Sequence, residues 1–356
     1  MKEVFKYHLN YELKVDEKNY IDHGLVGLTN LGNTCYLNSI LQCLSNTLKL
    51  TDFFLSGDYK ADITKHNLKN FEHYIIMSFN SLLSNIWESN ENIITPKSFK
   101  DNLFKFIKKY YSHEQQDSHE CLLYILDLLH KGLSYQIEVD ISGQVVTKND
   151  QLMKDSMEVW KKHYSDSYSI FIELFYGQYH GYISCKEPDC GHYSSTFDPF
   201  SSIQLPIENK DCKLLDCLTN YFDDHSDLDL KCEKCSKNTN RKLDFWKIPD
   251  FLIIQLKRFT NDNEKINSLV DFPLENLDLT SFISPEKQDP NKYIYNLYAI
   301  NCHSGGTNGG HYYSKCKNLN GSWYIFNDEN VSKYASNSNL INNDAYILFY
   351  HRVFIK

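Results

Sequence analysis

The stretch Gly27-Leu-Thr-Asn-Leu-Gly-Asn-Thr-Cys35-Tyr-Leu-Asn38 decides the fold, because an apolar helix pattern begins at its cysteine. Leucine and isoleucine recur at helical spacing after Cys35 and predict a helix over 35–48. Asn33 and Thr34 are suitable cap residues for it. A helix N-terminus carries partial positive charge and unpaired N–H groups, which favour a thiolate. Cys35 is therefore a candidate nucleophile, and the alternative is a buried structural cysteine.

Asn30 lies five residues before Cys35 in the same loop. A side-chain amide at this place can donate to the oxyanion that forms when a thiolate attacks a carbonyl, together with backbone N–H groups at the helix start. An ordinary turn asparagine is the alternative interpretation.

A thiol hydrolase also needs an imidazole that takes and returns the proton, and a third group that orients the ring. His311 follows a glycine-rich loop over 304–310 and opens a strand-like run over 311–317. His303 is the rival base, but it precedes that loop and has no evident orienting partner in the sequence.

The residues after this strand predict a hairpin with its turn at 318–321. With a four-residue loop His311 faces Asp328, and with a two-residue turn it faces Asn330. Both registers bring His311 near Asn327 and Asp328, whose oxygens can accept a ring N–H. We therefore predict a catalytic triad, against the alternative that these two residues only form a strand-end turn.

Four other cysteines form two closely spaced pairs, Cys185 with Cys190 and Cys232 with Cys235. Such spacings suit a tetrahedral zinc ion, which here would join two hairpins that are distant in sequence. The pattern predicts one structural zinc and no catalytic metal, because four thiolates leave no open coordination position. Four unliganded thiols are the alternative.

Composition limits the class of protein. The 356 residues, 42% of them hydrophobic, can bury a sizeable core in one large unit or two smaller domains. A formal net charge of −9 argues against nucleic acid as a partner. The eleven cysteines suggest no disulfide framework, which indicates a reducing intracellular compartment, cytoplasmic or nuclear. We see no signal peptide or membrane-spanning stretch and expect no membrane association.

Helical patterns fill the first half of the chain and strand patterns the second. The predicted helices cover 35–48, 68–88, 97–110 and 115–130, and a polar insertion at about 138–167 contains a short helical part near 153–163. The predicted strands cover 251–259, 293–303, 311–317, 322–328 and 345–351, with a loop at 281–292. This order predicts an α+β architecture, papain-like in that the helix of the nucleophile packs against a sheet that carries the base.

The motifs, in this order, resemble those of the ubiquitin-specific proteases, the papain-like cysteine proteases that remove ubiquitin, over residues 25–351. The stretch from Gly27 to Ser39, with Leu41 and Gln42, is similar to the family's cysteine box, and Gln115 to Glu120 is similar to its second box. The zinc-bearing fingers are matched by Cys185 to Gln204 with Cys232 and Cys235, and the block that follows by Leu252 to Phe259 with Val270 to Pro273. The histidine box is matched by Gly309 to Tyr312 with Trp323 to Asp328.

The resemblance implies a role for each matching residue. Cys35 is the nucleophile, His311 the general base and Asn327 the residue that orients it, with Asp328 in support. Asn30 matches the oxyanion donor.

Asp117 and Glu120 match acidic positions that contact the basic C-terminal tail of ubiquitin, and they also fit a helix cap. The implied catalytic domain is 25–353, preceded by an extension over 1–24. It has a helical thumb at about 25–168, zinc-bearing fingers at about 170–245 and a palm of antiparallel sheet at about 246–353.

The implied activity is hydrolysis of the bond between the C-terminal glycine of ubiquitin and lysine amines of target proteins or ubiquitin chains. The implied partners are ubiquitin, ubiquitinated proteins and a regulatory protein. A protease for another ubiquitin-like modifier and a non-catalytic ubiquitin-binding module are the alternatives.

Overall fold

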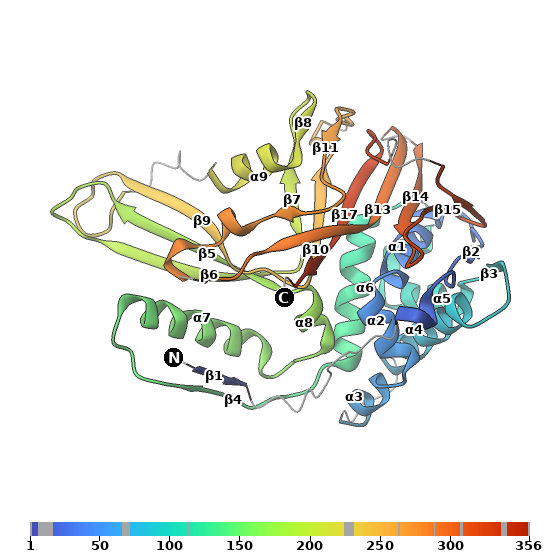
Figure 1. Ribbon diagram of the computed structural model, residues 1–356, viewed down its shortest axis with the longest axis horizontal. Coiled ribbons are helices and arrows are strands. Elements are labelled where there is room, and N and C mark those ends of the chain that lie inside the picture. Colours follow the sequence, from blue (N-terminus) through green and yellow to red (C-terminus); the bar gives the residue numbers. More distant parts are fainter. Residues whose placement is uncertain are drawn as a thin grey trace.

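The computed structural model describes residues 2–5, 17–65, 72–112, 114–223, 231–262, 264–287, 289–306, 309–335 and 340–354. Most helices gather at one end, a long sheet crosses the middle, and a three-stranded sheet extends to the other end (Figure 1). We call these parts the thumb, the palm and the fingers. The predicted α+β architecture is confirmed, while the predicted domain boundaries stay predictions.

Among the residues described, the thumb contains the helices α1 to α6 and the later helix α8. The helices are α1 Cys35–Ser45, α2 Leu48–Leu55, α3 Tyr59–Lys65, α4 Glu72–Trp87, α5 Lys97–Phe106, α6 Ser118–Leu133, α7 Lys148–Tyr164, α8 Ile170–Phe175 and α9 Leu214–Asp223, and the 3-10 helices are η1 Glu17–Tyr20, η2 Lys108–Ser112, η3 Thr280–Phe282 and η4 Pro285–Lys287. The helix expected over 35–48 is shorter, because the chain turns at Asn46, whose amide donates to the Gln42 carbonyl at 2.9 Å. Residues 68–71 of another predicted helix lie outside the described residues.

Helix α1 lies between the thumb and the palm, and every one of its residues is buried. The buried Asn301 joins three elements here. Its amide nitrogen donates to the Ser39 hydroxyl on α1, and its oxygen accepts from the Ser118 hydroxyl on α6, both at 2.8 Å. Since an unpaired polar group would be costly in this core, these bonds fix the position of α1 against the sheet.

The palm sheet has the strand order β16-β15-β14-β13-β17-β10-β7, and β12 also pairs with β13. Its neighbours are antiparallel, except that β7 and β10 run parallel. The strands are β1 Lys2–Phe5, β2 Gly27–Leu28, β3 Ile93–Ile94, β4 Val139–Ser142, β5 Gly177–Cys185, β6 Tyr193–Phe200, β7 Ile203–Pro206, β8 Cys212–Lys213, β9 Thr239–Lys247, β10 Phe251–Lys257, β11 Val270–Asp271, β12 Leu277–Asp278, β13 Ile294–Gly306, β14 Gly309–Lys317, β15 Trp323–Asn327, β16 Asn330–Lys333 and β17 Ala345–Val353.

Alternate side chains of the central palm strands enter two different apolar clusters. Ile253 and Ile347 pack with the thumb, whereas the next residues along each strand, Ile254 and Leu348, pack with α9 and its surroundings. A sheet buried on both faces explains why β10 reads as a continuous apolar run.

The register of the β14–β15 hairpin differs from both expected registers. Ser314 pairs with Phe326, and the backbone N–H of Asn318 donates to the Ser322 carbonyl at 2.9 Å. The loop therefore has three residues and ends at Gly321, which has a φ of +81°. A glycine in this conformation closes a three-residue hairpin loop, so the register falls between those of two- and four-residue loops.

The fingers consist of β6, β5 and β9, and the predicted insertion over 138–167 lies along them as β4 and α7 (Figure 1). The short predicted helix is confirmed but longer, because Thr147 and Asp150 form a capping box that starts α7 earlier. Leu152 of α7 packs against Phe197 and Trp246 of the fingers. Within the part of the chain that the structure describes, no helix is both long and apolar enough to cross a bilayer.

Candidate active site

Cys35 is the first residue of α1, and only 2% of it is exposed. The backbone N–H of Tyr312 is directed at the sulfur, and the N–H groups of Tyr36 and of Cys35 at the helix start also favour its charged form. Burial nevertheless raises the pKa of the thiol, and the negative charge of Asp328 raises it further. The N–H groups at the helix start favour the thiolate, as expected, but loss of water outweighs them and the net shift of the pKa is upward.

The loop before Cys35 is held by its own side chains. Thr34 is the N-cap of α1, but its side chain makes no cap hydrogen bond, contrary to expectation. Its hydroxyl accepts from the Leu31 N–H at 2.8 Å and donates to the Asn30 side-chain oxygen at 3.3 Å. Thr34 thus fixes the side chain of Asn30 instead of capping the helix.

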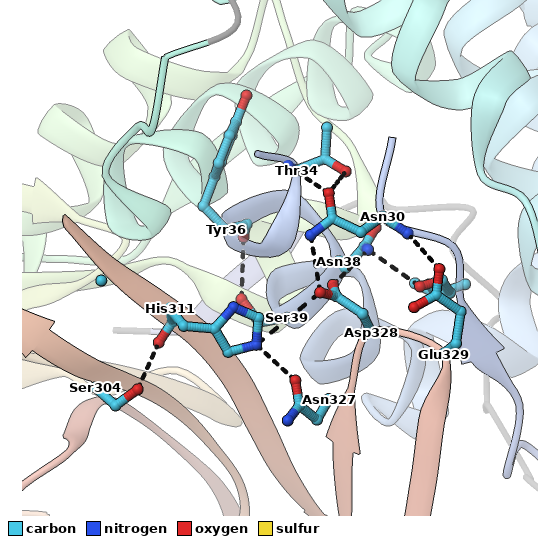
Figure 2. Close-up of polar contacts among 12 residues, drawn as sticks. Asn30, Thr34, Tyr36, Asn38, Ser39, Ser304, His311, Asn327, Asp328 and Glu329 are labelled. Atoms are coloured by element: carbon cyan, nitrogen blue, oxygen red, sulfur yellow. Dashed lines mark hydrogen bonds and ion pairs between the residues drawn. The ribbon is translucent and has the colours of Figure 1, made fainter. Parts of the chain in front are cut away.

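His311 lies on β14, and Figure 2 shows its ring directed at the turn that ends β15. Its Nε2 atom is 2.5 Å from the Oδ1 atom of Asn327 and 4.0 Å from a carboxylate oxygen of Asp328. The side chain of His311 is 40% exposed, and the next residue, Tyr312, donates its backbone N–H to the Cys35 sulfur. The strand therefore brings an oriented, accessible imidazole to the start of α1.

Asp328 lies between Asn30 and Asn38, whereas its neighbour Asn327 lies at the imidazole ring of His311 (Figure 2). One carboxylate oxygen accepts from the Asn30 amide and the other from the Asn38 amide, both at 2.8 Å. Asp328 therefore anchors the loop and the helix on either side of Cys35, while Asn327 contacts the imidazole. The sequence interpretation missed Asn38, although it lies one helical turn after Cys35 and shares its side of α1.

Asn30 makes further contacts that limit what its amide can do. Its side-chain oxygen accepts from the Thr34 backbone N–H at 3.1 Å, and its backbone N–H donates to the Glu329 carboxylate at 3.0 Å. One amide hydrogen is taken by Asp328, which leaves the second for an oxyanion. The oxyanion role of Asn30 stays a prediction.

Gly27 is required by the close approach of the β15–β16 turn. A Cβ atom at Gly27 would lie 2.2 Å from the backbone oxygen of Glu329. The adjacent Leu28 N–H donates to the Asp328 carbonyl at 2.9 Å. Glu329, which no sequence pattern singled out, thus helps to hold the β15–β16 turn against the loop before Cys35.

His303, the rival base, is buried inside the palm. Its ring packs against Phe259 and Tyr312, at centroid distances of 5.3 and 4.6 Å. Burial lowers its pKa to about 4, so it stays neutral near pH 7. Of these two histidines, His311 is the one whose ring is accessible and has an orienting partner.

The acidic residues of the second box are both engaged. Asp117 caps α6 by accepting from the Glu120 N–H at 2.9 Å, and it also accepts from the Tyr346 hydroxyl at 2.5 Å. Glu120 forms an ion pair with Lys109. The cap interpretation is confirmed for Asp117, whereas the Glu120 side chain pairs with Lys109, and contact of either residue with a basic tail stays a prediction.

The four predicted metal ligands come together at the tips of two finger hairpins. The sulfur atoms of Cys185, Cys190, Cys232 and Cys235 all lie within 4.8 Å of one another. Cys185 is 3.4 Å from Cys235 and Cys190 is 3.7 Å from Cys232. Four sulfurs around zinc at about 2.3 Å stand roughly 3.8 Å apart, so these residues fit one tetrahedral zinc ion.

Comparison with known proteins identifies the family. A family model described as "Ubiquitin carboxyl-terminal hydrolase" matches residues 26–350. The chain belongs to this family. Its members of known sequence include human "Ubiquitin carboxyl-terminal hydrolase 2", which is 36% identical over 343 residues, covering 92% of this chain and 55% of the relative. The chicken (Gallus gallus) protein of that name is 37% identical, over 92% of this chain and 93% of the relative.

The hydrolase-family chain thus spans about half the length of the human relative. Among solved structures, the "SAGA Ubp8/Sgf11/Sus1/Sgf73 DUB module bound to ubiquitin aldehyde" matches with a TM-score of 0.71 at 24% identity, over 94% of this chain and 70% of that one. Another structure, the "Ubp8-Sgf11-Sgf73-Sus1 SAGA DUB module", matches with a TM-score of 0.66 at 25% identity, over 94% and 69%. These likenesses show that the fold is shared.

Proposed function

We propose that this chain is a thiol isopeptidase that hydrolyses the bond between the C-terminal glycine of ubiquitin and lysine amines of target proteins or ubiquitin chains. The observation that carries this proposal is the contact between β14, the strand that bears His311, and α1, the helix that begins with Cys35. Asn327 orients the imidazole at 2.5 Å, and the residue after His311 donates its backbone N–H to the Cys35 sulfur. Nucleophile, base and orienting group are the parts that acyl transfer needs.

The raised pKa of Cys35 defines the first step. The sulfur attacks the glycine carbonyl carbon as His311 takes the thiol proton, because the thiol is largely protonated before attack. Backbone N–H groups of Cys35 and Tyr36, with the second amide hydrogen of Asn30, can donate to the oxyanion.

The tetrahedral intermediate then breaks its C–N bond, and His311 gives the proton to the departing lysine amine. A thioester between Cys35 and the glycine remains. His311 next takes a proton from water, whose oxygen attacks the thioester carbonyl. The C–S bond breaks and His311 returns its proton to the sulfur. Ubiquitin leaves with a carboxylic acid, which loses its remaining proton to water and becomes a carboxylate.

We propose that the cysteine cluster binds one structural zinc ion and that the chain works in a reducing compartment, cytoplasmic or nuclear. The zinc would tie the β5–β6 turn to the turn before β9, with Cys185, Cys190, Cys232 and Cys235 as ligands. The four thiolates would fill its coordination, so the metal has a structural role. Thiolate ligands must stay reduced, which favours such a compartment.

We propose ubiquitin as the substrate protein and a further protein partner for regulation. Asp117 and Glu120 lie at the N-terminus of α6 in the thumb, and carboxylates there would suit a basic tail. The solved relatives support both points, since one is titled as bound to ubiquitin aldehyde and the same module contains Sgf11, Sus1 and Sgf73.

Reaction with ubiquitin that carries a C-terminal electrophile tests the proposal, with other ubiquitin-like modifiers in parallel. We expect the wild-type chain to form an adduct with ubiquitin and to hydrolyse a ubiquitin C-terminal amide. Cys35→Ala is expected to lose both reactions and to keep ubiquitin binding, whereas Cys212→Ser, outside the site, keeps both.

Full turnover by Cys35→Ala would refute the proposed nucleophile. A wild-type adduct with another modifier instead of ubiquitin would change the substrate class. Ubiquitin binding without any turnover would identify a non-catalytic binding module.

A further inference from the structure

The outer edge of β14 is covered only in part. Strand β15 pairs with β14 from Ser314 to Lys317. Backbone groups of alternate residues in a strand point to the same side, so Gly310 and Tyr312 present theirs on the edge that Ser314 presents to β15. Tyr312 uses its N–H on the Cys35 sulfur. The edge at 310–312 therefore leads along the strand to the nucleophile.

Gln115 of the thumb occupies this edge at Gly310. Its side-chain nitrogen donates to the Gly310 carbonyl at 2.6 Å, and its side-chain oxygen accepts from the Gly310 N–H at 3.1 Å. One carboxamide thus satisfies both backbone groups, as a residue of a neighbouring strand does in a hydrogen-bonded pair. The side chain of Gln115 is exposed, so water and other ligands can compete for this place.

Gly310 can be approached only from this edge or from the solvent side. On its inner face, a Cβ atom would lie 2.1 Å from the Nε2 atom of His303. His303 is itself buried, with 5% of its surface exposed, and cannot withdraw into open space. Backbone pairing along the edge is therefore the contact that Gly310 offers to an extended chain.

We infer that Gln115 sets the affinity for the substrate tail, because its carboxamide holds the backbone position that an extended tail takes on its way to Cys35. The inference rests on the proposed function. Gly310 lies two residues, roughly 7 Å, from Tyr312 along the strand, so it faces the tail about two residues before the scissile bond. The tail and Gln115 compete for the same two backbone groups of Gly310.

This competition has a measurable consequence. A protein whose binding-competent state is only partly populated binds its ligand more weakly by that fraction. Each hydrogen bond to Gly310 favours the occupied state by a factor of roughly two to ten over water. Removal of the carboxamide is therefore expected to lower KM about three- to tenfold. The value of kcat changes little, since other groups hold the imidazole and the sulfur.

The test compares steady-state kinetics of the full chain and its variants on a ubiquitin C-terminal fluorogenic amide and on a short peptide amide ending in Gly-Gly. Gln115→Ala is expected to lower KM for both substrates by a similar factor, and Gln115→Asn, one methylene too short to reach both groups, shifts KM in the same direction. Gln151→Ala on α7, which removes an exposed glutamine paired with Asp155, is the matched control with unchanged KM. Equal melting temperatures check that the variants fold.

An unchanged KM in Gln115→Ala would overturn the inference. A raised KM would overturn it too, because Gln115 would then bind the tail. In both cases turnover of ubiquitin leaves the proposed function standing. Absence of turnover by the wild-type chain on both substrates would instead remove the proposed function, and the inference with it.

Discussion

The Nε2 atom of His311 lies 2.5 Å from the Oδ1 atom of Asn327, which makes Asn327 the closest polar partner that the ring has in this site. We predict that Asn327→Ala lowers kcat about tenfold to a hundredfold, because the imidazole loses the acceptor that fixes its orientation. The carboxylate of Asp328, 4.0 Å away, is expected to limit this loss. Asn327→Asp keeps an acceptor and restores most of kcat. Equal kcat values for wild type and Asn327→Ala would contradict the assignment.

Asp328→Ala is expected to damage stability as well as activity. Its carboxylate accepts from Asn30 and Asn38, and these part-buried amides lose a charged acceptor in the variant. Loss of such a partner destabilises a protein by roughly 1–3 kcal/mol per group. Urea unfolding should show a smaller free energy of unfolding for Asp328→Ala than for Asn327→Ala. The reverse order would show that Asp328 does not anchor the loop.

The residues of the site could be predicted where the chemistry is local. Cys35 was predicted from a helix start, which the structure has. His311 was predicted from a strand after a glycine-rich stretch. The strand exists but begins at Gly309, and residues 304–306 belong to the preceding strand instead of a loop. The four cysteines were found from their spacing. Such signals depend on neighbours in sequence, which is why these positions needed no knowledge of the fold.

Other features depend on contacts between distant segments, and the sequence patterns could not reveal them. Asp328 reaches Asn30 only because it adopts a left-handed φ of 49° in a tight turn between two strands. Both predicted registers of the β14–β15 hairpin were wrong, because Gly321 closes a loop of three residues, one more or one fewer than the predicted loops of two and four residues. The helix start favours the thiolate of Cys35, as expected, but burial by the palm and thumb raises its pKa overall, and no local pattern indicates that burial.

The pH dependence of Cys35 alkylation tests this raised pKa. In the protein without substrate, we expect the rate of reaction with iodoacetamide to rise with pH and to reach its midpoint above the ordinary thiol pKa of about 8.5. Asp328→Asn removes a negative charge that opposes the thiolate, so its midpoint should lie at lower pH. A midpoint below that of free cysteine would show that the helix start dominates after all.

Loss of the zinc ion is expected to destabilise the fingers, which lie apart from the catalytic residues. We expect about one zinc ion per wild-type chain by elemental analysis, and loss of that ion in Cys232→Ser. The melting temperature of Cys232→Ser should fall, because the two hairpin tips lose the metal link between them. Cys212→Ser, whose thiol contacts Cys217 outside the cluster, should keep the metal. A wild-type chain without metal after growth in zinc would contradict the site.

Stability is expected to fall in mild acid, and His180 allows one source of this fall to be isolated. The ring is fully buried between Phe197 and Trp246, and burial lowers its pKa to about 4. An unfolded chain binds the proton at about pH 6.5, so the stabilising contribution is complete above that pH and is lost as the pH falls toward 4. This amounts to about 2 kcal/mol between pH 7 and pH 5. His180→Phe cannot bind this proton in either state. Between pH 7 and pH 5 its free energy of unfolding should therefore decrease by about 2 kcal/mol less than that of the wild type. Identical decreases in wild type and variant, measured by urea unfolding at both pH values, would show that His180 is protonated inside the folded fingers.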